Sequence, residues 1–145
     1  MMGPTRNTAI NSEHIDFLSK IIILKITYPG GDYKKRKIIT KFRISAHDLE
    51  IERGRYRGLK ADRRTCNLCQ SVVEDEVHFL MECPNFKPVR KPILESISSK
   101  YVNFQKLDTQ QKFIWIMSSE DHFIYEHLYS LLSTLNIHRA GILGR

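Results

Sequence analysis

Three cysteines and one histidine lie close together in the middle of the chain, and their spacing is typical of a metal site. They read Cys-x2-Cys-x8-His-x4-Cys, at Cys66, Cys69, His78 and Cys83. Two residues between the first cysteines allow a tight turn that aims both thiolates at one metal, and the second pair completes a tetrahedron of sulfur and imidazole ligands. Catalytic zinc keeps one position open for water, whereas here protein groups fill all four positions. We therefore predict one structural zinc ion.

Other uses of three cysteines fit this sequence less well. A disulfide framework is poorly supported, because the cysteine count is odd and no secretory signal sequence is visible. A redox Cys-x-x-Cys would need a neighbouring βαβ pattern, which the sequence does not contain. Three buried hydrophobic cysteines, close together by coincidence, are the remaining alternative. The expected compartment is intracellular and reducing, either nuclear or cytoplasmic.

The elements that must position the four ligands are a short hairpin and a helix. Gln70 to Val73 is long enough for a hairpin return, and the acidic run Glu74 to Glu76 suits the first turn of a helix, whose dipole is positive there. That helix is expected to carry His78 and to end just before Cys83. Residues 65–84 are thus predicted to form a zinc-knuckle or treble-clef-like module.

The rest of the sequence favours helices, so the expected fold class is mainly α with this small zinc-binding hairpin-plus-helix module. Residues 1–32 are predicted to form an N-terminal extension that is disordered at 1–11. A helix is expected at 12–27, although the β-branched residues of this segment are also compatible with a strand. Residues 33–64 are expected to form a basic helical segment capped by Asp32. Residues 85–140 are expected to form a helical segment packed on the module. Its predicted helices begin near Pro92, span 109–117, and run from 119 or 120 to about 136.

Composition is consistent with one compact unit without a membrane span. The chain has 145 residues, 41% of them hydrophobic, which is enough for a core. No apolar run approaches the ~18 residues expected of a membrane helix. Membrane insertion is therefore not expected.

Positive charge is concentrated directly before the first cysteine. Residues 33–64 hold twelve Lys and Arg against four Asp and Glu, so this stretch carries +8 while the whole chain carries +7. Clustered basic residues beside a metal module are typical of nucleic-acid binding, although a solvated helix face or a localisation signal at 34–37 would look similar. Tyr56 lies among arginines and is the best candidate for base stacking, with packing against the zinc module as its alternative. The predicted nucleic-acid-binding residues are Arg53, Arg55, Tyr56, Arg57, Lys60, Arg63 and Arg64.

Three segments together resemble a known family. The run KFRISAHDLEIERGRYRGL, the four ligands with EDEVHFLMECP, and KFIWIMSSE are similar to the C-terminal zinc-binding region of non-LTR (LINE-type) retrotransposon reverse transcriptase polyproteins. The resemblance covers roughly residues 33 to 140. It implies zinc at the four ligands, a position downstream of a reverse transcriptase domain, and a role in holding template RNA or target DNA.

The resemblance does not imply an enzyme in this chain. No paired aspartates for two-metal catalysis and no nuclease cluster of Asp, Glu and Lys are found in the sequence. We therefore expect a non-catalytic accessory module that binds RNA or DNA. The alternatives are a protein-interaction module that docks on a polymerase domain, or a non-functional remnant of a truncated element.

Overall fold

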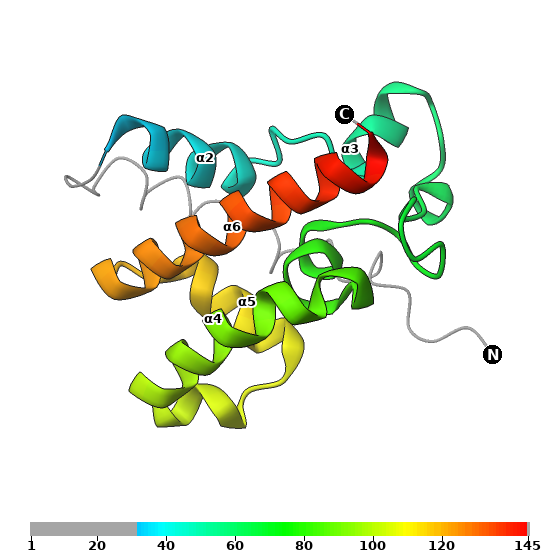
Figure 1. Cartoon of the computed structure of the whole chain (residues 1–145). Helices are drawn as coiled ribbons and strands as arrows, with labels where there is room; N and C mark the ends of the chain where they lie inside the picture. Colours follow the sequence, from blue (N-terminus) through cyan, green and yellow to red (C-terminus); the bar gives the residue numbers. More distant parts are fainter. Residues whose placement is uncertain (1–31, 145) are drawn as a thin grey trace.

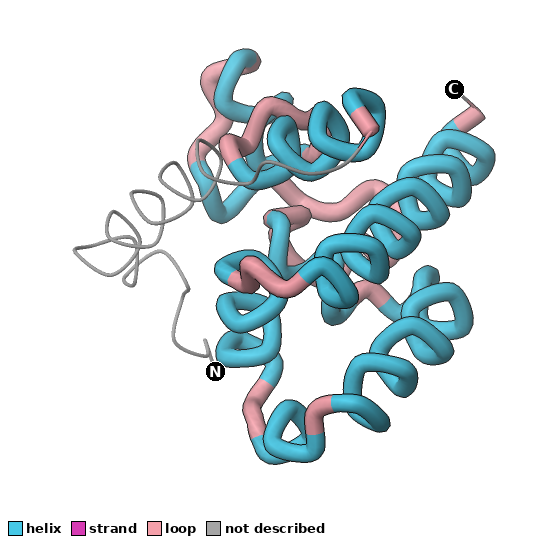
Figure 2. The backbone as a smooth tube through the Cα atoms, turned by 90° about the vertical axis from the view of Figure 1, so that its left-hand side faces the viewer, coloured by secondary structure: helices cyan, strands magenta, loops and turns pink. Residues whose placement is uncertain are grey.

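The computed structural model describes residues 32–144, and this part of the chain is mainly helical, as predicted. Figure 2 shows helices joined by loops, and within 32–144 no residue belongs to a strand. Extended backbone pairs there at an isolated antiparallel bridge between Thr65 and Val73. The predictions for 1–11 and 12–27 lie outside the described residues.

The described elements are five α-helices and four shorter helical turns (Figure 1). The turn η3 is π-helical, and η2, η4 and η5 are 3-10 turns. None of the described helices has both the length and the apolar character needed to cross a membrane. In chain order they are α2 (Tyr33–Arg43), α3 (Glu50–Tyr56), η2 (Ala61–Arg63), η3 (His78–Glu82), η4 (Pro84–Phe86), α4 (Lys87–Lys100), η5 (Val102–Lys106), α5 (Thr109–Ser118) and α6 (His122–Leu143).

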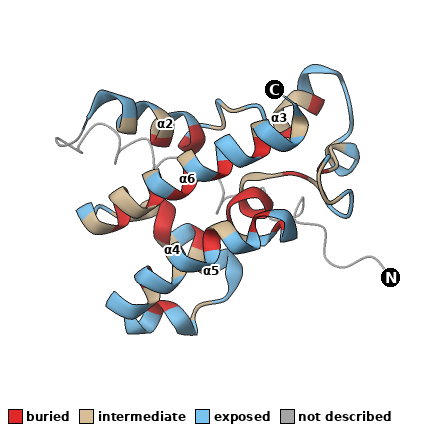
Figure 3. Ribbon diagram, in the orientation of Figure 1, coloured by how far each residue is buried: buried red, intermediate tan, exposed pale blue. Residues whose placement is uncertain are grey.

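Helix α6 is the centre of the packing. It lies between α2 and α4 in Figure 1 and also contacts η3. Its buried residues recur at helical spacing, so one stripe of the helix faces the core, and buried segments gather along its inner side in Figure 3. The leucines of this stripe are 0–1% exposed: Leu128, Leu131, Leu132 and Leu135.

Helix α2 begins where the sequence predicts, directly after Asp32. The side chain of Asp32 accepts a hydrogen bond from the backbone N–H of Lys34 at 3.1 Å, which caps the helix. Ile39 and Phe42 are buried. On the same helix, Lys35 Nζ lies 2.7 Å from Glu126 Oε2 of α6, so this lysine holds α2 against α6.

Two helix boundaries differ from the predictions. The helix expected to begin near Pro92 begins at Lys87 instead, with Pro88 in its first turn and Pro92 inside it. A proline in the first turn removes no intrahelical hydrogen bond, and α4 tolerates Pro92 because packing outweighs local propensity. The last helix begins at His122, after the cap Asp121, and continues to Leu143 rather than to about 136.

Helix α5 begins with a reciprocal cap that offers a test of local stability. Asp108 accepts from the backbone N–H of Gln111 at 2.8 Å, and the Gln111 side chain accepts from the N–H of Asp108 at 3.1 Å. We expect Asp108→Ala to lower the free energy of unfolding by about 1 kcal/mol, because one helix N–H loses its partner. Asp108→Asn keeps a side-chain oxygen that accepts this hydrogen bond, so the free energy of unfolding should change by only a few tenths of a kcal/mol. Thermal denaturation measures both changes. Equal losses in both variants would contradict a capping role.

Candidate metal centre

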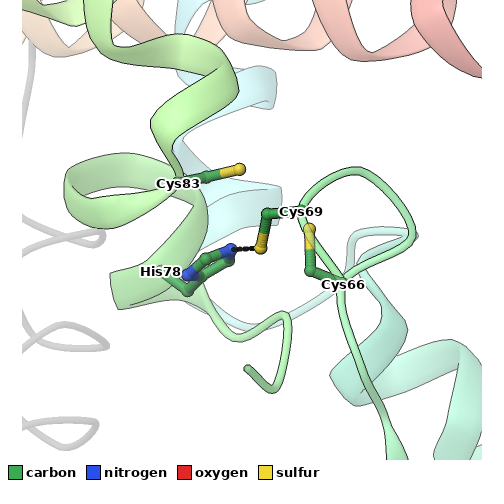
Figure 4. A group of neighbouring side chains, drawn as sticks. All are labelled: Cys66, Cys69, His78 and Cys83. Carbon is green, nitrogen blue, oxygen red and sulfur yellow. Dashed lines mark hydrogen bonds between the residues drawn. The ribbon is translucent and has the colours of Figure 1, made fainter. Parts of the chain in front are cut away.

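The four predicted ligands converge in the structure. The two segments that carry them meet so that Cys66 and Cys69 lie on one side and His78 and Cys83 on the other (Figure 4). Their ligand atoms all lie within 4.8 Å of one another, and Cys69 Sγ is 3.4 Å from His78 Nε2. Donors around tetrahedral zinc are separated by about 3.3 to 3.8 Å, given bond lengths of about 2.0 to 2.3 Å. The group can therefore hold a metal ion after small side-chain movements.

The loop that carries the first two cysteines is closed by backbone hydrogen bonds. The N–H of Cys66 donates to the carbonyl of Val72 at 2.9 Å, and the N–H of Gln70 donates to the carbonyl of Cys66 at 2.9 Å. Gln70 has a φ of 57°, the left-handed conformation that lets the chain turn back directly after Cys69. These contacts fix the spacing of the two thiols.

A π-helical turn presents the second pair of ligands. Asp75 Oδ1 accepts from the N–H of His78 at 2.7 Å and caps the turn. The N–H of Cys83 donates to the carbonyl of His78 at 2.7 Å, which is the i to i+5 bond of a π-helix. As a result, His78 and Cys83, five residues apart, both reach the other two ligands. The prediction that His78 lies within a helical turn and that Cys83 follows its end is confirmed.

Of the acidic run predicted to start a helix, Asp75 caps the helical turn and Glu76 begins it, whereas Glu74 has a different role. It precedes the helical turn and is 1% exposed. Its carboxylate accepts from the N–H of Glu50 at 2.8 Å and from Arg139 through Nη2 at 2.8 Å and Nε at 3.1 Å. The Cys66 thiol points at the same carboxylate, with Sγ 3.7 Å from Oε2. Glu74 therefore connects a metal ligand, helix α3 and helix α6.

Arg90 organises the other half of the centre. It is a buried residue of α4, and its guanidinium donates to the carbonyl oxygens of Leu80 at 3.0 Å and Cys83 at 2.8 Å. These carbonyls lie at the end of the π-helical turn, where they lack helical partners. Arg90 thus holds the backbone at Cys83 in place and puts a positive charge near its thiol. Neither Arg90 nor Arg139 is among the site residues predicted from the sequence.

The protonation of the two thiols in the Cys-x-x-Cys loop differs. Burial raises the pKa of Cys66 to about 12, and the charge of Glu74 acts in the same direction. Burial acts to raise the pKa of Cys69 as well, but hydrogen bonds from the Ser71 N–H and the Cys66 side chain outweigh it, so the pKa is lowered. A coordinated metal deprotonates a thiol outright, so metal binding would displace the Cys66 proton.

Among the predicted nucleic-acid-binding residues, Arg64 uses its side chain in internal contacts that stabilise the fold. Its guanidinium donates to the carbonyl of Ile51 at 2.9 Å and to that of Leu59 at 2.8 and 3.0 Å. Its aliphatic part crosses Gly54, where a Cβ atom would lie 2.4 Å from Arg64 Cγ. Only glycine allows this approach, so Arg64 braces helix α3.

Arg57 and Arg53 lie around the buried carboxylate of Glu50. Arg57 Nη2 is 2.5 Å from Glu50 Oε2, and Arg53 Nε is 3.9 Å from Oε1. Glu50 also accepts from Asn67 Nδ2 at 3.0 Å, and Asn67 lies in the loop between the first two cysteines. These pairs attach α3 to the metal centre and leave the outer parts of both arginines at the surface.

The remaining predicted residues are open to solvent. Tyr56 is 82% exposed, so the alternative in which it packs against the metal module is wrong. The Arg55 guanidinium lies 5.4 Å from the centre of the Tyr56 ring and 2.9 Å from Glu52 Oε2. Lys60 and Arg63 are exposed, and their side chains make no ion pair within residues 32–144. An exposed aromatic ring and three exposed basic groups therefore lie on α3, on η2 and in the loop between them, in the segment that precedes Cys66.

Comparison with known proteins does not place the chain in a family. No protein-family model, no curated protein and no solved structure matches it. The residues and their geometry are therefore the basis of the functional assignment.

Proposed function

We propose that this chain is a zinc-stabilised nucleic-acid-binding module without catalytic activity of its own. The observation that carries the proposal is the convergence of four soft ligands directly after an exposed basic and aromatic surface. Zinc is favoured because three thiolates and one imidazole suit a borderline-soft ion in tetrahedral geometry. With four protein ligands the ion has no open position, so its role is structural, in a module of the zinc-knuckle or treble-clef-like kind.

The surface formed by Arg55, Tyr56, Lys60 and Arg63, here called the α3–η2 surface, is the proposed contact with nucleic acid. Lysine and arginine bind phosphates and release counterions, which gives affinity without sequence selectivity. The exposed Tyr56 ring adds a platform on which a base can stack. Arg53, Arg57 and Arg64 support this surface through their contacts with α3, and the outer atoms of Arg57 can add a phosphate contact.

The biological setting that we propose is a retrotransposon reverse transcriptase. The sequence resemblance supports it, and an accessory module that holds template RNA or target DNA needs no catalytic residues. The competing proposal, a module that docks on a polymerase domain, would be favoured by an exposed tryptophan. Trp115 is partly buried and lies 5.2 Å from the rings of both Tyr101 and Phe104, so it gives that proposal little support.

Loss of two charges from the α3–η2 surface should weaken nucleic-acid binding in a salt-dependent way. Lys60→Ala with Arg63→Ala removes two phosphate contacts without breaking an ion pair. The slope of log affinity against log salt should become shallower by about 1.8 for a duplex and about 1.4 for a single strand. Fluorescence anisotropy with labelled RNA and DNA across a salt series measures this slope.

The matched control is Lys37→Ala with Lys87→Ala, which removes the same charge from exposed positions on α2 and α4. This control should keep the slope of the unmodified chain. Equal changes in both variants would mean that only net charge matters. A chain that binds neither RNA nor DNA at low salt would refute the proposed function.

A further inference from the structure

A hollow walled by aromatic rings lies at the other side of the molecule from the α3–η2 surface. It is formed by the end of α4, by η5 and by Trp115 of α5, at the end of α4 away from η3; Figure 1 shows where these elements lie. Its volume is about 420 Å³. The lining residues are Lys100, Tyr101, Val102, Asn103, Phe104, Leu107 and Trp115.

The aromatic rings of this hollow pack against one another, and part of their surface stays exposed to solvent. Trp115 is 5.2 Å from Tyr101 and 5.2 Å from Phe104, centre to centre, with the rings tilted by 64° and 53°. Phe104 is fully buried, whereas Tyr101 and Trp115 are partly buried and Val102 is 67% exposed. The Tyr101 hydroxyl donates to the Asp121 carboxylate, which fixes the Tyr101 ring at the start of α6. The wall is therefore held in place before any ligand arrives.

Lysine ammonium groups lie beside the rings of the hollow. Lys100 is part of its lining, and its Nζ lies 5.6 Å from the Tyr101 ring and 4.1 Å from the Phe123 ring. Lys112 Nζ lies 5.5 Å from the Phe104 ring, and Lys106 is exposed on η5. An aliphatic side chain of a protein partner would gain nothing from these charges. A planar base attached to a phosphate would use both the rings and the ammonium groups.

We propose that this hollow binds an unstacked nucleobase of single-stranded nucleic acid, with Lys100 near the adjoining phosphate. The inference rests on the proposed function and narrows it, because a base inside a duplex is stacked on its neighbours and cannot enter a ring-lined hollow. The hollow and the α3–η2 surface then contact different stretches of one strand. Single strands bind both regions, whereas duplexes bind the α3–η2 surface alone.

Trp115 is the only tryptophan in the chain, so its fluorescence reports on the hollow directly. The test titrates the full chain with single-stranded oligouridylate and with an RNA duplex of the same length, at one salt concentration. The single strand is expected to quench Trp115 emission with the same midpoint as binding measured by anisotropy. The duplex is expected to bind without quenching.

A substitution tests the same site independently. Tyr101→Leu should weaken single-strand binding about tenfold through the loss of one stacking partner, and should leave duplex binding unchanged. Tyr33→Leu is the matched control, since Tyr33 is 67% exposed on α2 and outside the hollow, and it should leave both affinities unchanged. Circular dichroism of each variant checks the fold, and the fluorescence titration of the unmodified chain decides the question if Tyr101→Leu unfolds.

The outcomes separate the two proposals. Binding of both RNAs with no change at Trp115, or with equal quenching by strand and duplex, would overturn the base-binding hollow and leave the proposed function intact. A leucine-rich peptide that shifts Trp115 emission where oligouridylate does not would also overturn it, in favour of a protein side chain. Absence of binding by either RNA or DNA would overturn the proposed function and this inference with it.

Discussion

Removal of the metal is expected to unfold most of residues 32–144, and not only the segment between the first and last ligand. Structural zinc in small fingers contributes about 10 to 16 kcal/mol of apparent binding energy, whereas a whole domain is stable by about 5 to 15 kcal/mol. The sequence alone favours local unfolding of the metal module, with the later helices surviving. In the structure, however, Phe79 and Leu80 lie in the chain between the candidate ligands His78 and Cys83. Phe79, Leu80 and Cys83 are each at most 1% exposed, and they belong to the same core as α6.

Circular dichroism and mass spectrometry of the intact protein test this expectation. Gently purified chain should carry one zinc per molecule, and chelation should abolish most of the helical signal in one cooperative transition that zinc reverses. Cys69→Ser should lose the metal and behave like the chelated chain, while Val72→Ala, a change at an exposed side chain in the same loop, should retain it. Metal content near zero would refute the site, and a helical signal that survives chelation would show that the C-terminal helices form a core without it.

The convergence of the four candidate metal ligands could be predicted from the sequence, because local spacing largely determines which groups can meet. Two cysteines separated by two residues can reach one metal, and a helical turn brings His78 and Cys83 to the same side, so the four side chains converge. The buried leucines of α6 could be predicted in the same way, because apolar residues at helical spacing in a sequence indicate a buried stripe. Both predictions rest on residues close together in the chain.

The partners of the buried charges could not be predicted, because no spacing rule connects them, whether the partner is distant, as for Arg139, or as near as Cys83 is to Arg90. Glu74 and Arg139 are 65 residues apart, so no local pattern connects them. A partial signal did exist. Arg139 follows Leu132 and Leu135 at helical spacing on the stripe that is otherwise apolar, and Arg90 stands in the same relation to Ile97. A charged residue on a buried stripe must find a partner, and the sequence does not say which.

The sequence also does not show which basic side chains have internal partners, so the net charge of residues 33–64 exceeds the charge that is free at the surface. Residues 33–64 carry +8, yet Arg43 is buried and Arg64 donates to backbone carbonyls. Lys35 is paired with Glu126 of α6. Composition counts charges without showing which are used internally, so the number available to nucleic acid is smaller than the sequence suggests.

Arg139→Met is expected to lower the free energy of unfolding by about 3 to 5 kcal/mol, because it leaves a buried carboxylate without its charged partner. Arg139 is 3% exposed and Glu74 is 1% exposed, so water cannot replace the lost contacts. Arg36→Met, on the exposed side of α2, is the matched control and should change stability by less than about 0.5 kcal/mol. Chemical denaturation of the zinc-loaded chain measures both.

A second variant separates loss of the ion pair from loss of packing. Glu74→Gln combined with Arg139→Met removes both charges, while the Gln carbonyl can still accept from the N–H of Glu50. The double variant should therefore be more stable than Arg139→Met alone, although less stable than the natural pair. If the two are equally unstable, the role of Arg139 is packing and not neutralisation of Glu74.

The same pair should influence metal affinity, because Glu74 Oε2 lies 3.7 Å from Cys66 Sγ. Once Cys66 is a metal-bound thiolate, two negative groups adjoin in the protein interior, and Arg139 is the cation that offsets them. Arg139→Met should therefore bind zinc more weakly, by tenfold or more, in competition with a chromophoric chelator, and the double variant should recover part of the loss. Unchanged zinc affinity in Arg139→Met would mean that α6 stabilises the fold without acting on the metal centre. A loss that the double variant reverses would mean that the C-terminal helix and the metal support each other through one buried carboxylate.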